Sequence, residues 1–343
     1  MKAALYRTHG GPEVLEFAEV PDPVAGPGEL VVRTAAVGLN RLDLLQRSGP
    51  AMLPHFQLPH IAGMDFAGTV EAVGPGVDPG RVGTRVVVNP SISCGSCALC
   101  ARGADHLCAA KTVIGGSING GYGELVAVPA THALPVPEHI DLVEAAALPT
   151  VYSRAWQSLF VSGRLAIGET LLVHAAASGV TIASVQLAKR AGARVIVTAR
   201  TDAELEFARG HGADAGINTT TTDVTEAVLE LTDGVGADMV FDHLGPALFD
   251  ASIRALRPAG RLVFCGTTTG ATVQLHLPTV YHRDITLIGS ASYTFGDFEQ
   301  MLAYCWSAGL PSIIDRRLPI TEIATAHELM AADRLRGKLV LVH

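Results

Sequence analysis

Four of the six cysteines of this 343-residue chain lie close together, and this cluster constrains the fold more than any other feature. Cys94, Cys97, Cys100 and Cys108 have the spacing C-x2-C-x2-C-x7-C. Four thiolates so spaced can surround one ion as a tetrahedral cage, which suits Zn2+ and leaves no coordination position open for water or substrate. The spacing therefore predicts a structural zinc site in a lobe at about residues 92–110. Disulfides need an oxidising compartment, and an iron–sulfur cluster is disfavoured because the spacing differs from ferredoxin runs.

Size and composition indicate about two domains with a sizeable core. The chain is 48% hydrophobic and 17% charged, and its net charge of -8 disfavours nucleic acid or an anionic membrane as partner. No apolar run at the start is long enough for a signal peptide. Thr170–Ala188 is uncharged and as long as a membrane span, but its central Gly179 and polar residues favour a strand, a turn and a helix. We therefore expect a cytoplasmic protein acting on a small molecule.

The N-terminal part of the chain contains many short strands. The expected strands are apolar and β-branched, and they lie at Lys2–Arg7, Leu15–Val20, Leu30–Val37, Phe66–Val73 and Arg85–Val88. Proline and glycine separate several of them. This pattern favours a compact β barrel.

The middle of the chain has the pattern of a βαβ unit. The expected elements are a buried strand at Thr170–His174, a turn at Ala175–Thr181, a helix at Ile182–Arg190 and a strand at Arg194–Thr198. Such a unit holds a dinucleotide pyrophosphate at the N-terminus of its helix. The usual turn has three glycines, and here small residues replace them at Ala175, Ser178 and Thr181. Small residues still allow close backbone approach, so we expect a nucleotide site.

These features together resemble the medium-chain dehydrogenase/reductase superfamily, which includes zinc-type alcohol dehydrogenases and quinone and enone reductases. The similarity continues through Gly212-Ala213-Asp214, residues 234–245 and residues 337–341, and so covers almost the whole chain. It implies a GroES-like β-barrel catalytic domain at residues 1–151 and 291–343. It also implies a Rossmann domain with a doubly wound parallel sheet at residues 152–290. Relatives commonly pair through the edge of this sheet, so a homodimer or homotetramer is expected.

The resemblance also identifies three altered positions. Asn40, Met64 and Thr150 stand where alcohol dehydrogenases have the cysteine, histidine and cysteine that bind catalytic zinc. An alcohol must lose its proton before its hydride can leave, and bound zinc promotes this as a Lewis acid. An amide, a thioether and a hydroxyl do not replace two thiolates and an imidazole at such a site. We therefore expect no catalytic metal. Asn40 and Met64 also have ordinary interpretations, Asn40 as a helix cap and Met64 as a core residue. The loss of all three zinc ligands together is therefore stronger evidence than any one of the changes.

Several residues near these positions are candidates for the chemistry. The resemblance implies that Asn40 and Thr150 orient the substrate or the nicotinamide. Tyr152 is a candidate proton donor, and water is an equal alternative. Arg154 replaces a threonine of the quinone reductase pattern. It could bind an anionic substrate group, such as a carboxylate or a coenzyme A phosphate, or point into solvent.

The resemblance places the cofactor residues after successive strands of the sheet. They are Ser178, Gly179, Val180, Thr181, Arg200, Asn218, Leu244, Gly245, Gly266, Thr267, Gly289 and Ser290. Arg200 stands where NAD enzymes have an acidic residue, and a guanidinium there could pair with the 2′-phosphate of NADP. Glu204 argues against this, because many NADP-binding relatives have lysine there, but Thr201-x-x-Glu204 also forms a capping box. We favour NADP over NAD.

The hypothesis that follows is an NADPH-dependent oxidoreductase acting on a quinone or an α,β-unsaturated carbonyl, with structural but no catalytic zinc. The developing enolate or phenolate is a weaker base than an alkoxide, so hydrogen bonds can stabilise it without a metal. Two alternatives remain. One is an alcohol dehydrogenase with an altered metal site, and the other is a non-catalytic NADP-binding sensor or scaffold.

Overall fold

The computed structural model describes residues 1–49 and 53–343. It divides the chain into two compact units, Met1–Val151 with Thr294–His343, and Tyr152–Tyr293. The first unit is built mainly of antiparallel β-structure and the second of a parallel sheet with helices. The expected combination of a β domain and an α/β domain is confirmed.

A seven-stranded sheet forms the body of the first unit. Its strands are β3 (Glu29–Gly38), β4 (Asp65–Val73), β5 (Arg85–Val88), β8 (Leu125–Pro129), β9 (Ala133–Pro135), β16 (Ile314–Pro319) and β17 (Lys338–Val342). The order is β16-β17-β3-β4-β5-β9, and β8 also pairs with β3. The remaining strands form two small antiparallel pairs, β1 (Lys2–Leu5) with β2 (Glu16–Glu19) and β6 (Ser91–Ile92) with β7 (Thr112–Val113).

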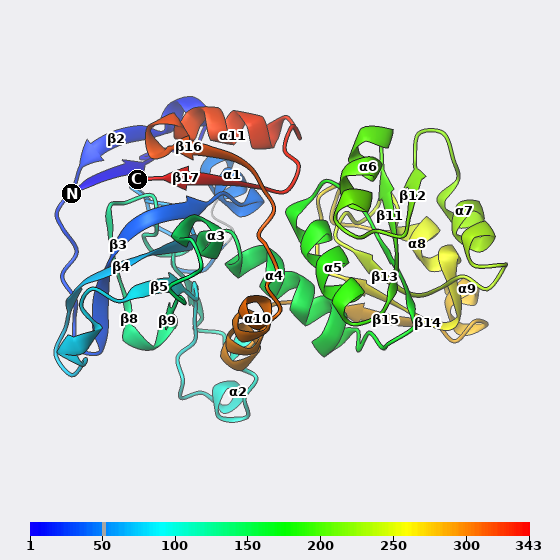
Figure 1. Cartoon of the computed structure of the whole chain (residues 1–343), viewed down its shortest axis with the longest axis horizontal. Coiled ribbons are helices and arrows are strands. Elements are labelled where there is room, and N and C mark those ends of the chain that lie inside the picture. Colours follow the sequence, from blue (N-terminus) through cyan, green and yellow to red (C-terminus); the bar gives the residue numbers. More distant parts are fainter. Residues whose placement is uncertain (50–52) are drawn as a thin grey trace. The chain divides into compact units, whose positions relative to one another are not determined.

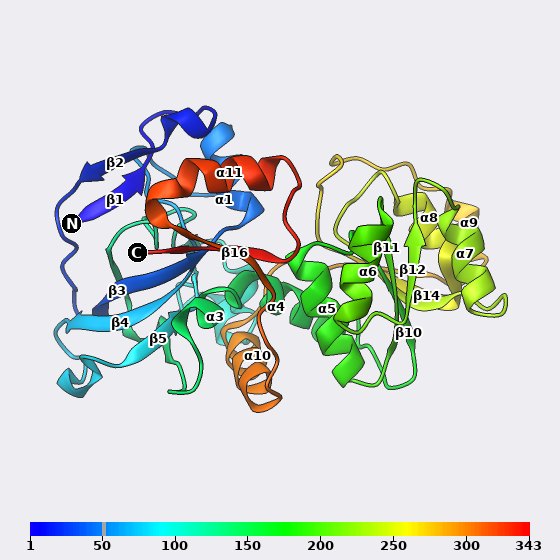
Figure 2. The same cartoon turned by 45° about the horizontal axis from the view of Figure 1, so that its top comes forward.

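Short helices accompany this sheet. They are α1 (Arg41–Ser48), α2 (Ala98–Ala101), α3 (Leu142–Ala146), α4 (Pro149–Trp156), α10 (Phe295–Ser307) and α11 (Ile323–Ala331). Helix α11 lies beside β16 and α1, as both views show (Figures 1 and 2). The core beneath them contains fully buried large side chains, among them Tyr6, Phe66 and Tyr122. Since the termini of the chain both enter this unit, residues far apart in sequence meet in its core.

The second unit is a doubly wound parallel sheet. Its strands are β10 (Thr170–Val173), β11 (Arg194–Ala199), β12 (Ala215–Asn218), β13 (Ala237–Asp242), β14 (Leu256–Phe264) and β15 (Thr286–Gly289). Their order is β12-β11-β10-β13-β14-β15, so the direction of winding reverses between β10 and β13. A crevice at the carboxyl ends of the strands beside such a reversal is the usual ligand site of these sheets.

Helices cover this sheet. They are α5 (Gly179–Arg190), α6 (Asp202–Gly210), α7 (Val224–Leu231), α8 (Phe249–Ala255) and α9 (Leu277–Tyr281), of which α7, α8 and α9 lie side by side (Figures 1 and 2). Helix α5 begins three residues earlier than the sequence indicates, because Ser178 already has the extended conformation of an N-cap. Among the described residues, no helix has the length and apolar character needed to cross a membrane.

Candidate functional site

A buried ion pair lies at the centre of the first unit. Lys338 opens β17 and is 4% exposed, and Asp65 opens β4 and is fully buried. The Lys338 Nζ donates to Asp65 Oδ2 at 3.1 Å, to Asn40 Oδ1 at 2.8 Å and to the Leu39 carbonyl at 2.8 Å. An ammonium group has three N–H donors. Lys338 therefore uses its full capacity on fixed partners.

The second carboxylate oxygen of Asp65 extends this cluster to α4. It accepts from the Thr150 backbone N–H at 3.0 Å and from the Thr150 Oγ1 hydroxyl at 2.5 Å. Thr150 Oγ1 also lies 3.5 Å from the Met64 sulfur. The structure therefore brings Asn40, Met64 and Thr150 together around one Lys338–Asp65 pair.

The segment that carries Asp65 has a glycine at each end for steric reasons. Gly63 has φ of +94°, and a Cβ there would lie 2.6 Å from the Tyr122 ring. A Cβ on Gly68 would lie 2.0 Å from the Arg33 carbonyl oxygen of β3, where the β3–β4 register shifts. The Gly-x-Asp-x-x-Gly pattern at 63–68 thus fixes the backbone on both sides of the buried carboxylate.

Asn40 is held from two directions. It occupies the N-cap position of α1, and its backbone N–H donates to Asp43 Oδ2 at 2.8 Å. Its side-chain oxygen accepts from Lys338, and its Nδ2 is 3.3 Å from the Gly38 carbonyl. The cap interpretation is therefore correct for the position, but the side chain also belongs to the cluster. Burial, together with the nearby charge of Asp65, raises the pKa of Asp43 to about 7, against the lowering effects of the Asn40 N–H and Lys338.

This cluster does not suit a zinc ion. Structural and catalytic zinc sites use thiolate, imidazole and carboxylate ligands. Asn40, Met64 and Thr150 supply an amide, a thioether and a hydroxyl, and the carboxylate of Asp65 is already neutralised by Lys338. What the arrangement can do is hold an amide and a hydroxyl in fixed orientation beside a fixed positive charge.

The four clustered cysteines form a second site in the same unit. Their sulfurs all lie within 4.8 Å of one another, with Cys97–Cys100 at 3.5 Å and Cys94–Cys100 at 3.9 Å. Zn–S bonds of about 2.3 Å in a tetrahedron place sulfurs about 3.8 Å apart. Backbone N–H groups of Ser96 and Cys97 lower the pKa of Cys94 to about 6, whereas burial and the neighbouring Cys97 raise the pKa of Cys100 to about 11, so the fit to zinc rests on the sulfur geometry. The residues present therefore fit a structural zinc ion.

The nucleotide site predicted from the sequence begins at the N-terminus of α5. Within the described parts of the chain, the backbone N–H groups of Gly179, Val180 and Thr181 have no protein acceptor. Such groups are suited to a pyrophosphate. The Thr181 side chain is not available to a ligand, because it is buried and donates to the His174 carbonyl at 2.6 Å. Thr181 therefore contributes its backbone alone.

The loop after β13 is tied to its strand. Leu244 and Gly245 donate their N–H groups to Asp242 Oδ1 at 2.8 and 2.9 Å. Gly266, which follows β14, lies so close to the neighbouring loop that a Cβ would be 2.1 Å from the His243 carbonyl oxygen. Thr267 continues this loop at the carboxyl edge of the sheet.

The other predicted cofactor residues also follow strands. Arg200 follows β11 and is exposed, Gly289 ends β15, and Ser290 Oγ lies 3.0 Å from Ser158 Oγ. Asn218 ends β12, and its Nδ2 donates to Asp202 Oδ1 at 2.8 Å. The Asn218 amide thus orders the start of α6, and a cofactor role for this residue stays a prediction.

The structure does not support Tyr152 as a proton donor. Its ring is 2% exposed, and its hydroxyl donates to Gln186 Oε1 of α5, within the second unit. A proton donor must reach its acceptor directly or through one water. The hydroxyl is buried and already bonded to Gln186, so a proton-donor role for Tyr152 stays a prediction that this geometry does not favour.

Sequence reasoning missed Lys338 as a site residue. The available signal was a lysine at the start of the apolar run Lys338-Leu339-Val340-Leu341, where the expected core strand would bury it. A buried lysine requires an acidic partner. Asp43 is likewise fully buried beside Asn40 and is not among the predicted site residues.

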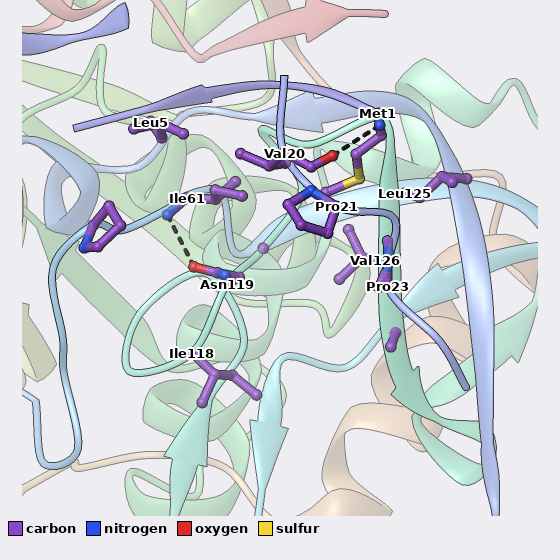
Figure 3. Close-up of a pocket in the computed structure, with 13 residues that line it drawn as sticks. Met1, Leu5, Val20, Pro21, Pro23, Ile61, Ile118, Asn119, Leu125 and Val126 are labelled. Carbon is purple, nitrogen blue, oxygen red and sulfur yellow. Dashed lines mark hydrogen bonds between the residues drawn. The ribbon is translucent and has the colours of Figure 1, made fainter. Parts of the chain in front are cut away.

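A cavity lies in the first unit, and none of the residues that line it belongs to the cluster around Lys338 and Asp65. It measures about 410 Å3 and is lined mostly by apolar side chains, including Met1, Val20, Pro21, Ile61 and Leu125 (Figure 3). Asn119 is a polar residue of the lining, and its Oδ1 accepts from the Ile61 N–H at 3.1 Å. No predicted site residue lines this cavity.

A β unit with a buried polar cluster and a cysteine lobe, joined in one chain to a doubly wound parallel sheet, is typical of two-domain dehydrogenases and reductases. Family models bear this out. The model described as alcohol dehydrogenase GroES-like domain matches residues 26–138, and the model described as zinc-binding dehydrogenase matches residues 179–307. The chain belongs to the zinc-binding dehydrogenase-like family of the medium-chain dehydrogenase/reductase superfamily and is an oxidoreductase.

Individual relatives are similar over their full length. A quinone oxidoreductase of Pseudomonas aeruginosa is 30% identical, with 99% of each chain covered. A 2-haloacrylate reductase of a Burkholderia species is also 30% identical, with 99% of this chain and 98% of the relative covered. A crystal structure of an NAD-dependent alcohol dehydrogenase matches with a TM-score of 0.95 and 38% identity over 100% of both chains.

Proposed function

We propose that this protein is an NADPH-dependent reductase of quinones or α,β-unsaturated carbonyl compounds, with a structural zinc ion and no catalytic one. The observation that carries the proposal is the Lys338–Asp65 pair, which occupies the centre of the Asn40, Met64 and Thr150 cluster. The full-length similarity to the quinone oxidoreductase and the 2-haloacrylate reductase supports the same reaction type.

The chain's own residues would orient the substrate and stabilise its developing charge. The bound dihydronicotinamide supplies the hydride. The Asn40 Nδ2 makes one long hydrogen bond, at 3.3 Å to the Gly38 carbonyl, so an N–H donor is available for a substrate oxygen. Thr150 donates its proton to Asp65 and therefore offers a lone pair rather than a donor. A preorganised donor such as the Asn40 N–H stabilises an enolate or a phenolate without reorganisation during the reaction.

The direct test mixes purified protein with NADPH or NADH and a panel of quinones and enals, and follows the loss of dihydronicotinamide absorbance. Turnover of at least one acceptor, faster with NADPH, is the expected result. Cofactor binding without turnover of any acceptor would favour a non-catalytic sensor or scaffold instead.

Arg200 supplies the predicted preference for NADPH. A guanidinium forms charge-assisted bonds to a phosphate, and an aspartate in its place would repel one. Arg200→Asp is therefore expected to raise the KM for NADPH about 100-fold and to leave the KM for NADH nearly unchanged. Arg190→Asp, at the exposed end of α5, is the matched control and should alter neither value. An unchanged KM for NADPH in Arg200→Asp would refute the assignment.

The zinc site makes a prediction that elemental analysis can check. Wild-type protein is expected to carry about one zinc ion per chain, because four thiolates close a structural site. Cys100→Ser is expected to lower the zinc content below about 0.1 ion per chain, since a hydroxyl is a poor replacement for a thiolate. Cys305→Ser is the control, because Cys305 is buried on α10, outside the cluster. A Cys100→Ser protein that keeps its zinc would contradict the site.

An alcohol dehydrogenase with an altered metal site is the second candidate. The similarity to the NAD-dependent alcohol dehydrogenase, at 38% identity over the whole chain, favours it. It requires a second zinc ion per chain and oxidation of alcohols with NAD. The same elemental analysis and a parallel assay with alcohols therefore separate the two candidates.

The second unit also suggests self-association. Strand β15 is the last strand of the six-stranded sheet, and the exposed Leu277 and Tyr281 lie on α9 in the same unit. An unpaired edge strand is a template for pairing with another chain. We infer a homodimer or homotetramer, for which light scattering should give a multiple of the 35.8 kDa chain mass.

A further inference from the structure

Arg154 is a half-buried cation of the second unit. It lies on the part of α4 that belongs to the second unit, and its Nη1 donates to the Ser290 carbonyl at 3.3 Å. Its charge also acts on the nearby thiol of Cys265. Among the residues that the structure describes, no carboxylate pairs with it. A guanidinium has five N–H donors, so most of its capacity is unused.

The contacts of Arg154 place it at the ligand edge of the sheet. Cys265 directly follows β14 and Ser290 directly follows β15, and these strands end side by side at Phe264 and Gly289. Ligands of such sheets bind at the carboxyl ends of the strands. In the proposed function the α5 N-terminus would hold the pyrophosphate, and Arg200 after β11 would lie on the adenosine side. Strands β14 and β15 lie on the opposite side of the winding reversal, which is the side left for the nicotinamide and the substrate.

The chemistry of Arg154 favours an anion there. The Ser290 carbonyl accepts one long hydrogen bond from this half-buried cation, which leaves N–H donors for an anionic ligand. The planar fork of a guanidinium matches a carboxylate through two parallel bonds. An arginine that served solubility alone would have no reason to be held against Ser290 and Cys265.

We propose that Arg154 binds the carboxylate of the substrate, and that the acceptor is therefore an α,β-unsaturated carboxylate. This inference rests on the proposed reductase function. A coenzyme A thioester fits less well, because its phosphates are separated from the reacting carbons by the long pantetheine arm. The anion that Arg154 meets beside the nicotinamide must lie within a few bonds of the double bond.

The reaction balances without any further reactant. The β-carbon accepts hydride from the dihydronicotinamide, the double bond breaks, and its electron pair moves to the α-carbon and the carboxylate. The α-carbon then takes one proton from solvent, which gives a saturated carboxylate and NADP+. Arg154 would pair with the carboxylate throughout, and most strongly when it carries the extra negative charge.

The test compares an alkenoate with its own primary amide, which has the same shape and no charge. Crotonate and crotonamide are assayed with NADPH in wild type, Arg154→Thr and Arg154→Lys. The ratio of kcat/KM for crotonate to that for crotonamide is expected to fall about 30-fold in Arg154→Thr. In Arg154→Lys this ratio should fall less than in Arg154→Thr, because lysine keeps the positive charge. Arg190→Thr is the matched control and should leave the ratio at the wild-type value.

A binding measurement keeps this inference separate from the reductase assignment. Butyrate, the saturated product, is titrated into the NADP complex of wild type and Arg154→Thr by calorimetry. The expected result is binding to wild type that is at least about 30-fold weaker in the variant. Equal affinity in both proteins, or an unchanged crotonate-to-crotonamide ratio, would overturn the role of Arg154. Loss of turnover with every acceptor, with Arg154-dependent butyrate binding intact, would instead overturn the reductase function.

Discussion

Replacing Lys338 by methionine is expected to lower the free energy of unfolding by about 3–5 kcal/mol, because it leaves a buried carboxylate without its counter-charge. Lys338 is 4% exposed, and its partner Asp65 is completely buried. Methionine keeps most of the aliphatic stem, so the change isolates the ammonium group. Urea unfolding of wild type and Lys338→Met at pH 7 measures the difference.

Two comparisons show whether burial of the charge is the cause. Arg33→Met removes an ion pair with Glu71 whose side chains are 53% and 45% exposed, and solvent-exposed pairs contribute little to stability. Adding Asp65→Asn to Lys338→Met removes the unpaired charge, while the amide oxygen can still accept from Thr150. The double variant is therefore expected to recover at least about 2 kcal/mol. A single Lys338→Met variant within about 1 kcal/mol of wild type would show that the pair is not needed.

Lys338 also illustrates what the sequence could not reveal. Its contact with Asp65 joins residues 273 positions apart, and it forms because β17 and β4 both pair with β3. The local pattern predicts β4 as a strand and the resemblance covers β17, but neither says that both strands flank the same third strand. The three altered positions Asn40, Met64 and Thr150 were recognised by resemblance, whereas the cation among them depended on sheet topology.

The cysteine cluster, in contrast, could be predicted from the sequence. Cys94, Cys97 and Cys100 are separated by two residues each, so a single turn and the short helix α2 are enough to bring their sulfurs together. The positions of these sulfurs depend on the local backbone, which the spacing of the cysteines in the sequence largely determines. The βαβ unit was predictable for a similar reason, because its strands are apolar runs bounded by glycine and polar turns.

The sequence did not predict in which directions the side chains of α4 point. Tyr152 and Arg154 are two residues apart on α4, and they point to different surroundings. Tyr152 faces Gln186 of α5, whereas Arg154 faces Ser290 after β15. Residues two apart on a helix do not share a face, but which face meets which strand depends on how α4 packs within the second unit.

Acidification from pH 7 to pH 5 is expected to destabilise the protein strongly, because three buried histidines are neutral in the folded state. Burial lowers the pKa of His60 to about 4, of His174 to about 4 and of His327 to about 3. The same side chains titrate near 6.5 in an unfolded chain. The unfolded state therefore binds more protons below pH 6.5, and stability falls as pH falls.

Asp43 acts in the opposite direction. Its pKa of about 7 in the folded state lies above the usual value for an aspartate, so the folded state takes up a proton as the pH drops below 7. One proton gained by the folded state offsets one of the three gained by the unfolded state. These four groups alone give about two protons of net uptake on unfolding, which corresponds to a slope of about 2.7 kcal/mol per pH unit near pH 5.

His327→Gln isolates one of these contributions. His327 meets Arg47 Nη1 at 3.0 Å and the Tyr122 hydroxyl at 3.2 Å, so the variant is expected to be less stable than wild type at pH 7. Between pH 7 and pH 5 it should lose about 2 kcal/mol less than wild type, because one histidine no longer takes up a proton on unfolding. His139→Gln, at an exposed position, should lose as much as wild type. If His327→Gln loses as much stability as wild type over this range, His327 is not buried in its neutral form.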